Sequence, residues 1–252
     1  EQYLNKIKVE RILSWGNQVD PDKLEEMVNR KIRQEKIAIK DVKLRTFITD
    51  DANRNEMVQH VYDITYGTVI ANQDTLVVID DSIVRGTTLK ESIIRMLSRL
   101  SPKKIIVVSS APQIRYPDCY GIDMSKMGDF IAFKAAIALL TEKGMTNIID
   151  DVYNKIKALE ASNELHTENV VRQLYKPFTP EDISDKIAQL ITPEHITIPV
   201  EVIYQTIEDL HLCCPTNTGD WYFTGNYPTP GGNKVCNKAF VNYVEGKNVR
   251  GY

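Results

Sequence analysis

The sequence predicts an α/β fold with a parallel sheet, and three consecutive segments carry this prediction. Residues 76–79 form a continuous apolar run, which is typical of a strand covered on both faces. A helix is predicted from residue 89 to residue 100, and a second apolar strand over residues 105–108. The apolar stripe of that helix consists of Ile93, Ile94, Leu97 and Leu100. Strand, helix and strand within about 35 residues make a βαβ unit with parallel strands and a right-handed crossover.

Weaker signals precede this unit. An Asp-Pro pair offers an N-cap and a proline at the first helical position, which predicts a helix over residues 21–35. Short β-prone pieces follow at residues 37–39, 46–48 and 67–70. Charged and polar residues interrupt these pieces, so the segment is expected to mix strand and loop.

Helical patterns dominate after the second strand. Apolar residues at helical spacing predict helices over residues 130–140 and 148–159. The run Thr179-Pro180-Glu181-Asp182 predicts the capped start of a third helix. Asn, Gly, Pro and aromatic residues dominate from Cys213 onward, which predicts an irregular tail.

These patterns divide the chain into two expected parts. Residues 1–160 form the α/β domain, and residues 161–252 form a mainly helical appendage with its irregular tail, packed against the sheet. A chain of 252 residues with 42% hydrophobic residues is long and apolar enough to build a sizeable core.

Composition also excludes several classes of protein. A formal net charge of −3 argues against a general nucleic-acid binder or a ligand of anionic membranes. No apolar run reaches the roughly 18 residues that a membrane span needs, and the opening residues lack the pattern of a signal peptide. Four irregularly spaced cysteines do not form a disulfide scaffold and are expected to be reduced thiols. The expected location is cytoplasmic.

The end of the first predicted strand carries the chemistry. Asp80 and Asp81 stand where parallel strands deliver residues to the ligand-binding crevice of α/β folds. Their carboxylates suit sugar hydroxyls or a hard cation such as Mg²⁺. The loop that follows consists of Ser82, Ile83, Val84, Arg85, Gly86, Thr87 and Thr88.

This loop has the features of a phosphate site. Gly86 lets the backbone turn tightly and approach an anion, and the Ser and Thr hydroxyls are donors. Thr88 and Glu91 are spaced as a capping box, which would start a helix with its positive dipole end at the loop. Carboxylates and loop together predict a ribose 5-phosphate site.

A plainer interpretation is an ordinary strand-to-helix connection with both carboxylates capping or solvated. The Asp-Asp pair alone would fit either interpretation equally well. An apolar strand, two acids, Gly-Thr-Thr and a capping box in one register favour the binding site. The loop lacks the spacing of a Walker A motif, and no dinucleotide fingerprint follows a strand.

Residues 76–88 resemble the phosphoribosyl pyrophosphate (PRPP) motif of type I phosphoribosyltransferases. The version Asp-Asp-Ser-Ile-Val-Arg-Gly-Thr-Thr resembles the glutamine PRPP amidotransferase family in particular. The segment 110–124 is similar to the stretch after the next strand in that family, with weaker echoes at residues 45–48 and 223–228. The resemblance therefore implies a phosphoribosyltransferase-like core, and an early position of the motif implies that this core is incomplete at its N-terminus.

The resemblance also implies roles for the residues of the motif. Asp80 and Asp81 would hold the ribose hydroxyls, directly or through Mg²⁺, and residues 82–88 would hold the 5-phosphate. Ammonia would attack C1 of PRPP to give phosphoribosylamine and pyrophosphate, a step of purine biosynthesis. The full-length protein would be a homo-oligomer, with no nucleic-acid or membrane partner.

The chain also departs from that family. The family's glutaminase half begins with a catalytic cysteine, whereas this chain begins at Glu1 and has no cysteine before Cys119. A glutaminase domain outside this chain is therefore expected to supply the ammonia, and the chain is expected to be a fragment with little or no turnover alone. The family's cluster-binding cysteine pattern is broken at residues 216 and 219, so no iron–sulfur cluster is expected.

The basic loop ahead of the motif is altered as well. Lys40, Lys43 and Arg45 are candidates to cover pyrophosphate, but solvated surface charges are an equally good interpretation. These changes motivate an alternative function, a non-catalytic or regulatory PRPP-binding paralogue. A conventional base phosphoribosyltransferase is a weaker third candidate, because it would not need the amidotransferase-like segment 110–124.

Overall fold

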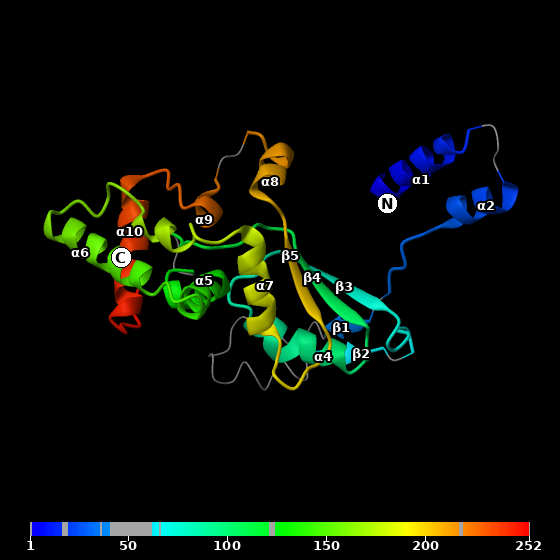
Figure 1. Cartoon of the computed structure of the whole chain (residues 1–252), viewed down its shortest axis with the longest axis horizontal. Coiled ribbons are helices and arrows are strands. Elements are labelled where there is room, and N and C mark those ends of the chain that lie inside the picture. The colour runs from blue at the N-terminus through cyan, green and yellow to red at the C-terminus, as the bar shows by residue number, and fades with distance from the viewer. Residues whose placement is uncertain are drawn as a thin grey trace.

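A computed structural model describes residues 2–16, 20–35, 37–40, 62–65, 67–120, 124–216 and 219–251. A three-stranded parallel sheet lies at the centre, with most of the helices gathered on one side of it and two N-terminal helices set apart (Figure 1). The predicted α/β class with a parallel sheet is confirmed. In the part of the chain that the structure describes, no helix is long and apolar enough to cross a membrane.

The central sheet has the strand order β3-β4-β5. β3 (Thr75–Asp80) and β4 (Lys104–Ser109) run parallel, with Leu76 opposite Ile105, as the βαβ prediction requires. β5 (Val200–Tyr204) adds a third parallel strand on the other side of β4. The carboxyl ends of all three strands therefore meet at one edge, where Asp80, Ser109 and Tyr204 share a row.

The crossover between β3 and β4 is one continuous helix with a π-helical part followed by an α-helical part. Its first part is a π-helical turn, η2 (Leu89–Ile93), and its second is α4 (Ile94–Ser98). Ile94, Leu97 and Leu100 are buried as predicted, and Ile93 packs against the core from a partly buried position.

The two faces of the sheet differ in their exposure to solvent. On one face Ile105 and Val107 of β4 are completely buried, at 0% exposure. On the other face Val77 and Ile79 of β3 are 59% and 73% exposed. The prediction that this strand is covered on both faces is therefore wrong, because the described helices pack on one side. We call the uncovered surface the open face; its apolar residues are Val77, Ile79, Ile106, Val108 and Ile203.

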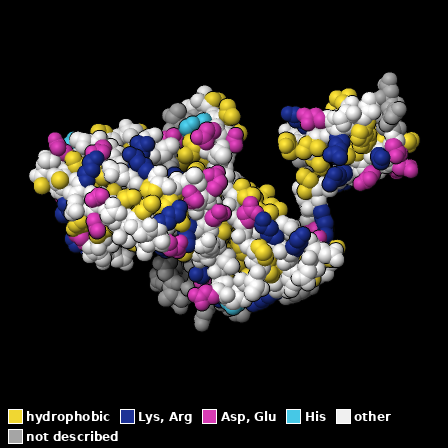
Figure 2. Space-filling model, viewed as in Figure 1, with side chains coloured by type: hydrophobic (Ala, Val, Ile, Leu, Met, Phe, Trp, Pro, Cys, Tyr) yellow, Lys and Arg dark blue, Asp and Glu magenta, His cyan; other side chains and the backbone are white. Residues whose placement is uncertain are grey.

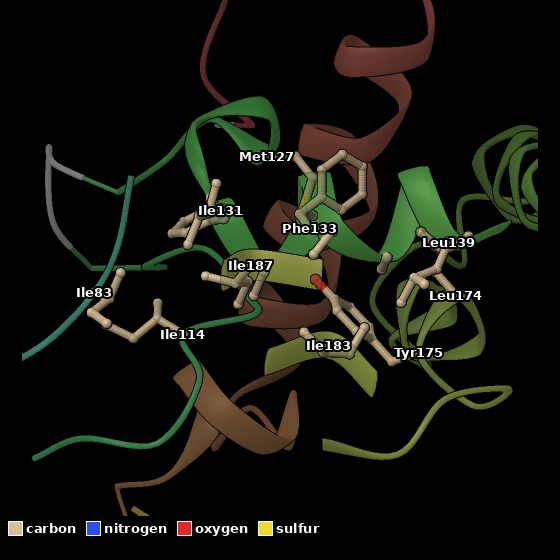
Figure 3. Close-up of a cluster of buried hydrophobic side chains, with 14 of the residues drawn as sticks. Ile83, Ile114, Met127, Ile131, Phe133, Leu139, Leu174, Tyr175, Ile183 and Ile187 are labelled. Carbon is tan, nitrogen blue, oxygen red and sulfur yellow. The ribbon is translucent and has the colours of Figure 1, made fainter. Parts of the chain in front are cut away.

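Helices beyond β4 build a continuous core. They are η3 (Met127–Asp129), α5 (Ile131–Glu142), α6 (Asn147–Ala161), η4 (Val170–Leu174) and α7 (Pro180–Ile191). In this core α7 packs against β5, and α5 packs against α7. The predicted helices 130–140 and 148–159 correspond to α5 and α6. The predicted cap of α7 is also confirmed, since Thr179 and Asp182 form a reciprocal capping box. Side chains of α5, α7 and η4 interlock in one cluster (Figure 3).

The last part of the chain is helical. It contains α8 (Ile207–Cys213), α9 (Trp221–Thr224) and α10 (Pro230–Val244). The irregular tail predicted from Cys213 is therefore wrong. α10 buries Phe240 against Phe133 of α5, with ring centroids 6.3 Å apart. Its buried Asn237 donates to the carbonyls of Leu165 (2.9 Å) and Glu168 (2.8 Å), so a residue that suggests a turn in the sequence serves the core.

The described residues of the N-terminal part form two helices and a small sheet. These are α1 (Gln2–Ser14), α2 (Pro21–Asn29) and the antiparallel pair β1 (Ala38–Lys40) and β2 (Tyr62–Ile64). The helix predicted over 21–35 begins at Pro21 but ends at Asn29. The β-prone piece at 37–39 overlaps β1, the piece at 67–70 is a turn instead, and the piece at 46–48 lies outside the described residues.

Candidate functional site

The site begins where β3 ends. Asp80 is the last residue of β3 and is partly buried, whereas Asp81 is exposed. The backbone carbonyl of Asp80 accepts hydrogen bonds from the amide of Ser110 (2.9 Å) and from its hydroxyl (3.1 Å). The polar residue that follows β4 thus fixes the end of β3.

The two carboxylates each accept from the next backbone amide. Asp81 N donates to Asp80 Oδ1 at 3.0 Å, and Ser82 N donates to Asp81 Oδ1 at 2.8 Å. Within the described residues, the second oxygen of each carboxylate has no protein hydrogen-bond donor. Partial burial, followed by the adjacent Asp81 carboxyl, raises the pKa of Asp80 above its ordinary value. The pair therefore favours a partner that brings hydroxyl donors or positive charge.

The loop after Asp81 is fastened to the core at several points. Ile83 is buried and belongs to the same cluster as Ile114 and Ile131 (Figure 3). The carbonyl of Val84 accepts from the amide of Ile131 at 2.8 Å, at the start of α5. These contacts come from apolar residues inside the motif and leave its polar residues toward solvent.

Arg85 extends the same attachment. Its Nη2 lies 3.4 Å from Asp129 Oδ2 in an exposed ion pair, and Asp129 closes the short helix η3. Sequence reasoning did not identify Asp129 or Ser110 as parts of this site. Ser110 carries a signal that could have found it, because it follows β4 as Asp81 follows β3.

Gly86 occupies a position that needs glycine. Its φ of +71° is in the left-handed region, and its carbonyl accepts from the amide of Lys90 at 3.0 Å. A Cβ there would lie 2.9 Å from Ile191 Cγ2 and 3.3 Å from Ile131 Cγ1. The close approach is therefore to the core, which sets the loop against α5 and α7.

The helix after the loop starts earlier than predicted. Thr88 has helical angles (φ −60°, ψ −39°) and makes no side-chain cap bond, so the predicted capping box with Glu91 is wrong. Glu91 instead pairs with Arg95 at 3.0 Å, four residues along the helix. Thr87 already lies in the helix, both Thr87 and Thr88 are exposed, and Thr88 makes no side-chain cap bond.

The arrangement can hold a polyol and an anion side by side. Two carboxylates lie at one end, and hydroxyls with the first amides of a helix lie at the other. Asp80 and Asp81 are hard oxygen donors of the kind Mg²⁺ prefers, and that ion usually keeps water or substrate oxygens as its other ligands. The described residues contain no group of three or more His, Cys, Asp or Glu placed to hold a metal by themselves.

The described part of the structure does not test the basic residues predicted ahead of the motif. Lys40 is the last residue of β1. Lys43 and Arg45 lie outside the residues that the structure describes. A role for these three in covering pyrophosphate stays a prediction.

Sequence comparison places this chain among known proteins. It is 34% identical over 121 residues to amidophosphoribosyltransferase of Haemophilus influenzae, covering 48% of this chain and 23% of that protein. It is 38% identical over 92 residues to the Escherichia coli enzyme (35% and 18%), and 30% identical over 158 residues to the Saccharomyces cerevisiae enzyme (61% and 20%). The matched part thus spans about a fifth of the length of these relatives. No protein-family model matches the chain.

Structural comparison finds glutamine PRPP amidotransferase from Bacillus subtilis, solved with ADP and GMP. The TM-score is 0.43, with 23% sequence identity over 76% of this chain and 32% of that one. The identification rests on the sequence matches, which recur in relatives from bacteria and yeast. The chain is a distant homologue of amidophosphoribosyltransferases over part of their length.

Proposed function

We propose that this chain is the PRPP-binding part of an amidophosphoribosyltransferase. The observation that supports the proposal most directly is the loop at residues 80–88, which combines two carboxylates with free hydroxyls at a helix start. The homologous enzymes carry the name of this reaction. A glutaminase domain outside this chain would supply the ammonia.

In this proposal the helix start holds the 5-phosphate. The hydroxyls of Thr87 and Thr88 are exposed and donate to its oxygens, together with backbone amides of the first turn. Gly86 lets the chain pass close to the core while it presents these donors. The guanidinium of Arg85 lies beside the loop, where it pairs with Asp129.

The carboxylates hold the ribose. The free oxygens of Asp80 and Asp81 accept from the two ribose hydroxyls, which gives the partly buried Asp80 the donors that its position lacks. Asp80 and Asp81 would hold Mg²⁺ directly or through the ribose. This ion would bind together with PRPP and offset the charge of the pyrophosphate.

The reaction needs positioning rather than a protein nucleophile. Ammonia forms a bond to C1, the bond from C1 to the pyrophosphate oxygen breaks, and its electron pair leaves with pyrophosphate. The new amine then releases a proton to solvent. Positive charge that develops on the ribose ring is stabilised by Asp80 and Asp81, which lie on the same strand end.

Binding is tested by calorimetric titration of PRPP with Mg²⁺ into the whole chain. Thr88→Val and Asp80→Asn are each expected to weaken PRPP binding about 10- to 100-fold, the effect of one lost hydrogen bond to a charged group. The matched controls are Thr197→Val and Asp150→Asn, both exposed and far along the chain from the loop. Equal weakening by test and control variants would contradict the assigned site.

Turnover is tested separately by pyrophosphate release with ammonia in place of glutamine. This chain alone is expected to give little or no release, and the full-length protein is expected to give release that Asp80→Asn abolishes. Tight PRPP binding without release by the full-length protein, unaffected by Asp80→Asn, would favour the alternative of a regulatory PRPP-binding paralogue. The altered residues around Lys40 are the observation that keeps this alternative open.

A further inference from the structure

The ion pair between Arg85 and Asp129 joins the loop of the candidate site to a fixed part of the core. Arg85 directly precedes Gly86, whose carbonyl accepts the first hydrogen bond of the following helix. Asp129 lies between Met127 and Phe130, which are both buried. The core therefore holds the backbone on both sides of the pair, and the two charged side-chain ends are the parts that can move.

The contact between the two charged groups is weak. Arg85 Nη2 lies 3.4 Å from Asp129 Oδ2, which is longer than a typical charge-assisted hydrogen bond. The two side chains are 45% and 37% exposed, and exposed ion pairs contribute little to folding. Among the described residues, the Arg85 guanidinium has this one hydrogen bond. Most of its five N–H donors are therefore available to a ligand.

Arg85 is the one basic residue of the segment 80–88. The same segment contains the carboxylates of Asp80 and Asp81, and Asp129 brings a third carboxylate to the single cation. The whole chain has a net charge of −3, and acidic and basic side chains are interspersed over the face shown in Figure 2. An anion is therefore attracted by local groups of the loop rather than by the charge of the whole chain.

A phosphate monoester is a stronger partner for this guanidinium than the carboxylate of Asp129. It carries close to two negative charges at neutral pH, and its oxygens can accept two parallel N–H bonds from arginine. Thr87, at the start of the helix, lies two residues from Arg85, at most about 7 Å away along the backbone. One phosphate group can therefore contact both the helix start and the long side chain of Arg85.

We propose that Asp129 sets the affinity of the phosphate site through Arg85. In the empty site Asp129 holds the guanidinium, and a bound phosphate monoester displaces the carboxylate and becomes the partner of Arg85. Asp129 thus competes with the ligand and keeps its affinity below the value that Arg85 would otherwise give. This inference rests on the proposed function, because it concerns the 5-phosphate of the same ligand.

The test is calorimetric titration of ribose 5-phosphate, and separately of PRPP with Mg²⁺, into the whole chain. Asp129→Asn is expected to tighten the binding of both ligands about 2- to 5-fold, the effect of releasing an exposed ion pair. Arg85→Gln is expected to weaken binding about 10-fold or more, because a charged hydrogen-bond donor is lost. In the Arg85→Gln background, Asp129→Asn is expected to tighten binding no more than the control does.

Glu168→Gln is the matched control. It removes the same charge from an exposed ion pair, in which Glu168 and Lys155 lie 2.8 Å apart and are 46% and 42% exposed. Lys155 belongs to α6, at the end of the helical part farthest from the sheet (Figure 1). Thermal unfolding shows whether each variant is folded, and Asp129→Ser repeats the test if Asp129→Asn lowers the unfolding temperature.

The outcomes separate this inference from the proposed function. Tighter binding by Asp129→Asn that disappears in the Arg85→Gln background supports the inference. Equal tightening in both backgrounds would show direct repulsion of the ligand by Asp129, and unchanged or weaker binding would show a supporting role for the loop; each overturns the inference.

The two ligands distinguish the two failures. PRPP binding that Asp129→Asn leaves unchanged would overturn the inference and leave the proposed function intact. The expected response with ribose 5-phosphate, together with no binding of PRPP, would overturn the proposed function alone. Absence of binding by either ligand would overturn both.

Discussion

The two faces of the central sheet have similar residues and opposite environments. Ile105 and Val107 on the covered face are completely buried, while Val77 and Ile79 on the open face are largely exposed. All four are β-branched and suit a strand equally well. The comparison shows that strand formation is encoded in the strand itself, whereas burial depends on the helices that the rest of the chain brings to each face.

The largest expected difference in stability is between two Ile→Ala substitutions, one on each face. Ile105→Ala is expected to lower the free energy of unfolding by about 2–5 kcal/mol, because it leaves a cavity among buried helices. Ile79→Ala on the open face is expected to cost less than about 1 kcal/mol, because its side chain is already in water. Urea unfolding of both variants measures the difference, and equal losses would show that the open face is in fact covered.

A smaller loss of stability is expected from a substitution in the loop, where Gly86 packs against the core beneath the covered face. Gly86→Ala is expected to cost about 1–3 kcal/mol, from a strained φ and from the contact of the new Cβ with Ile191. Gly144→Ala is the control, since Gly144 has a similar φ of +69° but nothing within 4 Å of a Cβ. Gly144→Ala therefore reports the backbone strain alone. Thermal unfolding measures both variants. If the two lose the same stability, the contact of the new Cβ with Ile191 makes no contribution.

The smallest expected effect is a pH dependence at the strand end. The pKa of Asp80 is raised in the folded state, mainly by burial, so folding disfavours its charged form and this destabilisation grows as the pH rises through the acidic range. Asp80→Asn should therefore stabilise the chain at pH 7 by less than about 1 kcal/mol, since solvent screens a half-exposed carboxylate. The gain should vanish toward pH 3.

Asp182 is expected to change the stability with pH in the opposite direction to Asp80. Hydrogen bonds from the amide and hydroxyl of Thr179 lower its pKa, so its stabilisation is present at neutral pH and is lost as the pH falls. Asp182→Asn should then destabilise at pH 7 and approach the parent chain in acid. Urea midpoints across pH 3–7 compare the two variants, and a shift of the same sign for both would contradict the burial argument at Asp80.

The βαβ unit could be predicted because its signals are local. The apolar runs of β3 and β4 and the stripe of Ile94 and Leu97 each lie within one element. β5 was not predicted as a strand of the sheet, because it pairs with β4 only after a long excursion through five helices. Residues 200–204 consist largely of strand formers, but their sequence does not show which strand they pair with.

The candidate site was predicted in position but not in detail. The strand-end carboxylates and the glycine lie where the motif places them, and Gly86 has the positive φ expected of it. The prediction of a capping box at Thr88 was wrong, because residue spacing alone does not show where a helix begins. Here the helix begins ahead of Thr88. The attachment of the loop to Asp129 and Ile131 depends on tertiary packing, which a single motif does not encode.

The hydrogen bond between the Val84 carbonyl and the Ile131 amide connects the loop to the start of helix α5. One end of α5 carries this bond, and Phe133 in its first turn stacks edge-on against Tyr243 of α10, with centroids 4.8 Å apart. The first turn of α5 therefore contacts both the loop and α10, which are more than a hundred positions apart in the sequence. A substitution at Tyr243 would change the packing of the turn to which the loop is bonded.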